Sequence, residues 1–302
     1  MAESVTQTSQ LPPAGPAWAG SLMGTSIAAT LSHLHGFDWL SRALLAAATI
    51  LFVVFTVSWV RRRNPQFAQE YMGPWGMTSM GILALGSAWT GCTGHWGAQI
   101  LSWVVATPLA VAVCLWQLRK FHGAPSFPWG LALVSPMVAA TSGGQIAQVV
   151  DASWSGFFHG VGVACFLLSL VTGVPVFVRV YADVVRGRLH LPATFAGTAW
   201  IPLGIVGQST AAAQLLFPHG VAHAYGLVMF TLGVPALAYA AYRFWPAALR
   251  WAEYSPGWWG STFPAGTLSL GSWLMGWHTL SAVFLGLLLV HWAACAVRFL
   301  TR

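Results

Sequence analysis

Long apolar runs separated by short polar or basic hinges occupy nearly all of this 302-residue sequence. A helix needs about 20 apolar residues to cross the hydrocarbon core of a bilayer. Ten stretches of suitable length predict ten helices, at 18–34, 39–60, 72–91, 97–118, 128–150, 155–180, 193–217, 219–245, 257–277 and 279–300. We therefore predict an all-α integral membrane protein with a short N-terminal segment (1–16) and a single transmembrane domain (17–302).

Basic residues fall at every second hinge of this pattern. Of the 13 Lys and Arg residues, 12 follow the even-numbered helices and only Arg42 lies on the opposite side. Cytoplasmic loops of membrane proteins carry such an excess of basic residues. The pattern predicts five helical hairpins in a multi-pass protein of the plasma membrane, with both termini cytoplasmic. The N-terminal residues before Ala17 contain no Lys or Arg, so we expect no signal peptide and a mature chain that starts near residue 1.

The odd-numbered helices differ in chemistry from the even-numbered ones. They are richer in Gly, Ser, Thr and Gln, and their predicted spans contain no Asp, Glu, Lys or Arg. Prolines recur in four of them at spacings of 62, 66 and 62 residues, namely Pro74, Pro136, Pro202 and Pro264. Small residues let helix backbones approach closely, and kinked helices persist where neighbours satisfy the freed carbonyls. We predict a ring of five odd helices, kinked at these prolines, inside an outer ring of five even helices. The alternative is that the odd helices are only buried packing helices.

Composition excludes several classes of protein. With 57% hydrophobic and 6% charged residues, the chain cannot cover the surface of a soluble globule, for which about 25% charged residues is usual. The net charge of +7 could indicate nucleic-acid binding, but the basic residues lie in hinges between apolar runs, which topology alone explains. We expect the bilayer as surroundings and no nucleic acid as partner.

An uncharged path through the ring has consequences for transport. A proton-coupled carrier usually needs a titratable group along its path, whereas a channel needs only a pore that solvates the ion moderately well. Neutral dipoles on the odd helices could line such a pore, and the candidates are Ser21, Thr25, Ser79, Thr141, Gln145, Gln208, Ser209, Ser269 and Ser272. The alternative for each hydroxyl is a bond to the carbonyl one turn back in its own helix.

Ten histidines raise the possibility of a metal or haem. His219 and His223 are four residues apart and would share a helix face, and His with Cys92 could bind zinc or copper. Histidines at the membrane interface explain the same pattern. No G-x-S-x-G, Walker or HExxH motif is present, so we expect no enzyme, no cofactor and no metal.

Four odd-helix segments carry a family resemblance. They read Gly20-Ser-Leu-Met-Gly-Thr25, Ser135-Pro-Met-Val-Ala-Ala-Thr-Ser-Gly-Gly144, Ile201-Pro-Leu-Gly-Ile-Val-Gly-Gln-Ser-Thr210 and Trp258-Trp-Gly-Ser-Thr-Phe-Pro-Ala-Gly-Thr267. In this order, on a ten-helix chain, they resemble the tellurite-resistance/dicarboxylate transporter family. That family includes bacterial tellurite-resistance channels, yeast malate carriers, fungal sulfite pumps and the slow anion channels of plant guard cells.

The resemblance implies a quasi-fivefold arrangement of hairpins around a central pore, and a homo-oligomer, often a trimer. It also implies a Phe in the ninth helix that plugs the pore, and Phe263 occupies the matching place. Gly24 matches a position where the family keeps pore space with Gly. The predicted pore-lining residues are Gly24, Ser21, Gly144, Thr141, Gly207, Gly266 and Ser269, with Phe263 as the gate.

The sequence and the family resemblance leave three possible functions. The first is a passive anion channel or uniporter for chloride, nitrate or similar small anions. The second is a carrier of the same family for C4-dicarboxylates, sulfite or tellurite, coupled to protons through His159, His223 or Asp151. The odd helices contain no obvious basic residue to bind a dicarboxylate. The third, from another class, is a membrane haem or metal redox protein.

Overall fold

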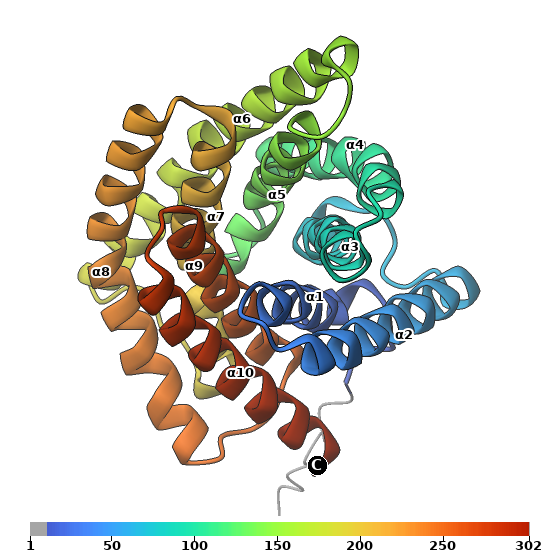
Figure 1. The fold of residues 1–302 in the computed structure, drawn as a ribbon. Coiled ribbons are helices and arrows are strands. Elements are labelled where there is room, and N and C mark those ends of the chain that lie inside the picture. Colours follow the sequence, from blue (N-terminus) through green and yellow to red (C-terminus); the bar gives the residue numbers. More distant parts are fainter. Residues whose placement is uncertain (1–10, 302) are drawn as a thin grey trace, which may run out of the picture.

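A computed structural model describes residues 11–301, and these residues form ten α-helices joined by short turns and 3-10 helices (Figure 1). The odd helices are α1 (Ala19–Leu34), α3 (Met72–Thr93), α5 (Gly130–Ala147), α7 (Ile201–Leu216) and α9 (Thr262–Leu274). The even helices are α2 (Asp38–Arg62), α4 (Gly97–Arg119), α6 (Ala152–Val185), α8 (His219–Leu249) and α10 (His278–Leu300). The prediction of an all-α fold with ten helices is confirmed. The first ten positions of the predicted N-terminal segment lie outside the described residues.

The ten helices form five hairpins arranged in a ring. Each odd helix packs against the even helix that follows it, and each odd helix also contacts the next odd helix. The ring closes because α9 returns to α1 (Figure 1). In Figure 1 the odd helices surround the centre and the even helices lie outside them, so the quasi-fivefold arrangement follows directly from the contacts.

Burial separates the two sets of helices. Every residue of α9 from Thr262 to Ser272 is buried, whereas only 17% of the most apolar window of α2 is buried. Among the described residues, the five even helices are long and apolar enough to cross a membrane by themselves. Even helices with exposed apolar side chains are suited to contact lipid, and they enclose shorter, more polar odd helices that are largely buried. The chain is therefore a membrane-embedded, multi-pass protein.

A structural repeat underlies the ring. A 3-10 helix precedes each odd helix: η1 (Pro16–Trp18), η2 (Gln69–Tyr71), η3 (Phe127–Trp129), η4 (Ala193–Trp200) and η5 (Pro256–Ser261). The first and last hairpins also turn in the same way. Gly36 and Gly276 have φ values of 79° and 78°, in the left-handed region that favours glycine, and both donate backbone hydrogen bonds three residues back. One supersecondary unit, used five times, builds the domain.

The four recurring prolines of the odd helices lie at two kinds of position. Only Pro136 lies in a helix interior. Pro202 is the second residue of α7, and Pro74 and Pro264 are the third residues of α3 and α9. The first turn of a helix has no internal acceptor for its N–H groups, so proline costs nothing there. Pro202 and Pro264 follow the change from 3-10 to α geometry, and a bend at these prolines stays a prediction.

Candidate pore along the ring axis

Two small cavities lie among the five odd helices. The first, which we call the polar cavity, has a volume of about 40 Å³. It is lined by Ile27, Thr30, Ala84, Ser87, Val138, Thr141, Ser142, Gln145, Gln208, Phe263 and Leu270. The second, which we call the methionine cavity, has a volume of about 20 Å³. It is lined by Gly20, Met23, Met77, Met80, Leu131, Val134, Ile201, Gly204, Trp259, Gly260, Phe263 and Pro264. All five odd helices contribute to each cavity, so both lie on the axis of the ring.

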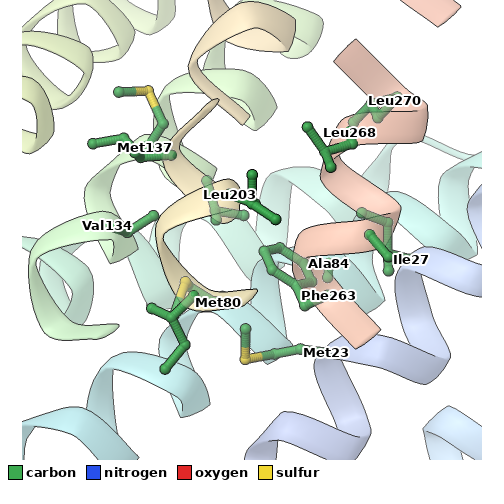
Figure 2. Close-up of a cluster of buried hydrophobic side chains, with 14 of the residues drawn as sticks. Met23, Ile27, Met80, Ala84, Val134, Met137, Leu203, Phe263, Leu268 and Leu270 are labelled. Carbon is green, nitrogen blue, oxygen red and sulfur yellow. The ribbon is translucent and has the colours of Figure 1, made fainter. Parts of the chain in front are cut away.

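Phe263 is the one side chain shared by these two linings. The methionine cavity takes residues from the N-terminal halves of the odd helices, and the polar cavity takes residues further along the same helices. Phe263 therefore lies between them. Its side chain is 4% exposed, and Figure 2 shows its ring among Met23, Met80 and Val134 from three other helices. The ring therefore contributes to the lining of both cavities at the level between them.

The lining follows a regular stripe along each helix. On α1 it runs through Met23, Ile27 and Thr30, and on α3 it runs through Met80, Ala84 and Ser87. Spacings of three and four residues keep side chains on one face of an α-helix. The stripe changes from apolar to polar as it passes Phe263. Sequence reasoning missed Met23, Met80, Ile27 and Ser87 because it selected glycines and hydroxyl residues individually; the aligned stripes were the signal that could have revealed them.

The cavities differ in what they can hold. A water molecule needs roughly 10–15 Å³ of such volume and two or more polar partners. The polar cavity has room for about three waters by that measure. The methionine cavity has room for about one, and its lining is almost wholly apolar. The described residues of both linings carry no formal charge, so an ion on this axis meets only neutral dipoles and apolar groups.

Two glutamine networks supply those dipoles. Gln208 Nε2 donates to Thr141 Oγ1 at 2.8 Å, and the Thr141 hydroxyl lies 3.2 Å from the Met137 carbonyl oxygen. One turn further along α5, Gln145 Oε1 accepts from Gln99 Nε2 of α4 at 2.7 Å, and the same Nε2 lies 3.2 Å from Ser142 Oγ. The structure thus brings the predicted candidates Thr141, Gln145 and Gln208 together around one space.

The predicted pore-lining glycines lie elsewhere. A Cβ atom on Gly24 would meet Thr262, one on Gly144 would meet Leu215, and one on Gly266 would meet Ile27. The same atom on Gly207 would lie 2.3 Å from the backbone carbon of Thr267. All four face a neighbouring helix and are absent from both linings. Their assignment as pore-lining residues is corrected: they permit close contact between helices of the ring.

Two predicted hydroxyl residues are also directed away from the cavities. Ser21 donates to the Trp18 carbonyl at 2.8 Å, and Ser269 donates to the Ser281 carbonyl of α10 at 2.8 Å. Neither belongs to a cavity lining. Ser21 thus bonds a carbonyl one turn back along the chain, which is the alternative to pore lining. Ser269 instead joins the two helices of the last hairpin.

The histidines give little support to a metal centre. The rings of His219 and His223 stack at a centroid distance of 5.7 Å. Within residues 11–301, no group of three or more His, Cys, Asp or Glu side chains is placed to hold a metal ion. His159 lies on an exposed part of α6, and its Nε2 is 2.9 Å from the Leu216 carbonyl oxygen.

A ring of membrane-embedded helices without Asp, Glu, Lys or Arg on its axis, around two axial cavities, is an arrangement suited to a membrane transport protein. The family model described as voltage-dependent anion channel matches residues 14–300, and the chain belongs to this family. The chain is similar to a sulfite efflux pump of Arthroderma otae, with 26% identity over 89% of this chain and 83% of that protein. A sulfite efflux pump of Trichophyton rubrum is 23% identical over 86% of this chain and 81% of that protein. The chain is therefore an anion-transport protein and not an enzyme.

Proposed function

We propose that this protein is a passive anion channel or uniporter for small anions such as chloride or nitrate, with the path along the ring axis and Phe263 as its gate. The observation that carries the proposal is that Phe263 alone lines both axial cavities. An ion that follows the axis has to pass this ring. Because the side chain lies near the start of α9, a rotamer change there would join the two cavities without moving the helices.

The chemistry of the lining supports passive transport. Conduction requires binding that is weak enough for the ion to leave, and a path without fixed charges provides only moderate solvation. The groups considered for proton coupling, His159, His223 and Asp151, are absent from both cavity linings. The plasma membrane, with both termini in the cytoplasm, is the location that the basic hinges favour.

A second function in the same family is a carrier for sulfite or another oxyanion. It is favoured by the relatives, which are sulfite efflux pumps. Transport of C4-dicarboxylates has less support, because no basic side chain contacts the axial cavities. Reversal potentials separate these two functions. The reversal potential of a passive channel depends on the anion gradient at any pH, whereas that of a proton-coupled carrier also shifts with the proton gradient.

Replacing Phe263 by alanine tests the gate. In liposomes, Phe263→Ala should raise basal chloride and nitrate flux many-fold over the unchanged chain. Phe166→Ala is the matched control, because Phe166 lies on α6, is also 4% exposed and lines neither axial cavity. A buried Phe→Ala change costs about 3–5 kcal/mol, so both variants need a folding check by size-exclusion chromatography. Equal flux from the two folded variants would refute Phe263 as the gate.

A further inference from the structure

The Gln208 amide faces Thr141 with its nitrogen. The Thr141 hydroxyl has two carbonyl acceptors, Met137 at 3.2 Å and the backbone of Gln208 at 3.5 Å, so its oxygen is left to accept from Gln208 Nε2. The nitrogen end of the amide therefore faces Thr141. The other end, Gln208 Oε1, has no hydrogen-bond partner in the described part of the chain, although the side chain is only 3% exposed and lines the polar cavity.

An unpartnered buried acceptor is costly. Leaving such a group without a hydrogen bond costs about 1–3 kcal/mol. Such an atom beside a cavity indicates a missing donor, which is a bound water molecule or a ligand that carries a proton. The position of the atom thus identifies one property of what enters the cavity.

Gln145, one turn beyond Thr141 on α5, presents the complementary group. Gln99 of α4 is 2% exposed and lies outside the ring of odd helices, yet its amide donates to Gln145 Oε1 at 2.7 Å. With its carbonyl oxygen held in this way, Gln145 has its Nε2 hydrogens left for the cavity that it lines. An amide N–H group is a donor for anionic oxygen atoms. The polar cavity therefore combines a donor from α5 with an acceptor from α7.

We propose that the polar cavity is a binding site for a singly protonated oxyanion, whose oxygen atoms accept from Gln145 and whose hydroxyl group donates to Gln208 Oε1. Halides and nitrate can only accept hydrogen bonds, so they leave Gln208 Oε1 unpartnered. A small oxyanion that retains one proton provides a partner for both glutamines, and the cavity, with room for about three waters, is large enough to hold it. This inference rests on the proposed axial path and specifies the class of anion that the path prefers.

Hydrogen carbonate and nitrate form a matched pair of probes. Both are planar monovalent oxyanions with four heavy atoms, and only hydrogen carbonate carries a hydroxyl group. Bi-ionic reversal potentials across planar bilayers, at mildly alkaline pH and in the Phe263→Ala background, give their permeability ratio. Carbon dioxide that crosses the lipid adds no current, and continuous perfusion with buffered solutions keeps the hydrogen carbonate concentration and the pH constant on both sides. Because hydration of the two ions is the same for every variant, the change of the ratio between variants reports the site.

Gln208→Met, which keeps the shape and removes the amide, should lower the ratio of hydrogen carbonate to nitrate permeability by about fivefold or more. Thr141→Val, a second variant, should also lower it, because it removes the acceptor that orients Gln208. Gln148→Met is the control, since this exposed residue follows α5 and lines neither axial cavity.

Two failures are distinguishable. An unchanged ratio in folded, conducting Gln208→Met and Thr141→Val chains would overturn the oxyanion site, leave water as the partner of Gln208 and leave the channel intact. Absence of anion current from the Phe263→Ala parent would contradict the proposed channel, and the oxyanion site with it.

Discussion

A Cβ atom on Gly24 would lie 2.1 Å from the Oγ1 of Thr262, so the absence of a side chain at Gly24 is what allows α1 and α9 to meet at this level. Thr262 directly precedes Phe263 and is fully buried. The contact between these two helices therefore sets the position of the aromatic ring relative to the axis. Gly24 acts on the candidate gate through packing, although it does not line the cavities.

Gly24→Ala should destabilise the fold by about 1–3 kcal/mol, the usual cost of overpacking. Its melting temperature in detergent should fall, and Thr262→Gly in the same chain should restore part of the loss because it vacates the space. Gly286→Ala on α10 is the control: nothing lies within 4 Å of the added atom, so it should be neutral or slightly stabilising. Equal melting temperatures for the Gly24 and Gly286 variants would contradict the packing role.

Gly207→Ala should be more damaging than Gly24→Ala. At Gly207 the added atom would lie 2.3 Å from the Thr267 carbonyl carbon and 2.4 Å from the Leu268 nitrogen, and both are backbone atoms of α9. Backbone cannot rotate aside as a side chain can, so α7 and α9 would have to separate. We expect poor yield of folded protein, measured as the monodisperse fraction on size-exclusion chromatography. A Gly207→Ala yield equal to that of Gly24→Ala would show that the ring tolerates wider helix spacing.

Cysteine labelling tests the orientation in the membrane. Gln66 and His190 are exposed in the hinges after α2 and α6, beside the basic residues, whereas Thr279 is exposed near the start of α10 at the opposite end. An impermeant maleimide should label Thr279→Cys in intact cells, whereas Gln66→Cys and His190→Cys should react only after permeabilisation. A chain without its four native cysteines serves as background. The reverse labelling pattern would place both termini outside.

His35, in the turn after α1, gives a pH dependence. Burial, and to a lesser extent the nearby His278, lower the pKa of His35 below its ordinary value of 6.5. Its Nε2 is 3.0 Å from Ser281 Oγ of α10 and joins the first and last hairpins. Because the folded state disfavours the charged ring, the stability that it provides is present above pH 6.5 and is lost as the pH falls through the lowered pKa.

The melting temperature of the unchanged chain should therefore drop between pH 7 and pH 5 by more than that of His35→Gln, which has no titratable group at this site. His122→Gln, at an exposed position before α5, is the control and should retain the full pH dependence. The exposed pair of His33 Nδ1 and Asp38 Oδ1, 2.8 Å apart, is present in all three chains and therefore does not distinguish them. Parallel pH curves for the unchanged and His35→Gln chains would show that His35 does not couple the hairpins to pH.

The trimer that the family resemblance implies stays a prediction.

The sequence by itself determined the helices, their pairing and their segregation. Apolar runs of bilayer length, such as 39–60, form helices because a helix satisfies all backbone hydrogen bonds of the run in lipid. The more polar odd helices have to be shielded from lipid by more hydrophobic helices. The family resemblance predicts Phe263 as the gate, and the structure shows that Phe263 lines both axial cavities.

Only the tertiary structure decided which face of each odd helix meets the axis. Gly24 and Met23 are neighbours in sequence, yet Met23 lines a cavity and Gly24 meets Thr262. Most sides of an odd helix are buried, so its pattern of apolar residues does not distinguish the axis from a neighbouring helix. The rotation of each helix is set by close packing of the whole ring, in which a glycine of one helix accommodates a side chain or the backbone of the next.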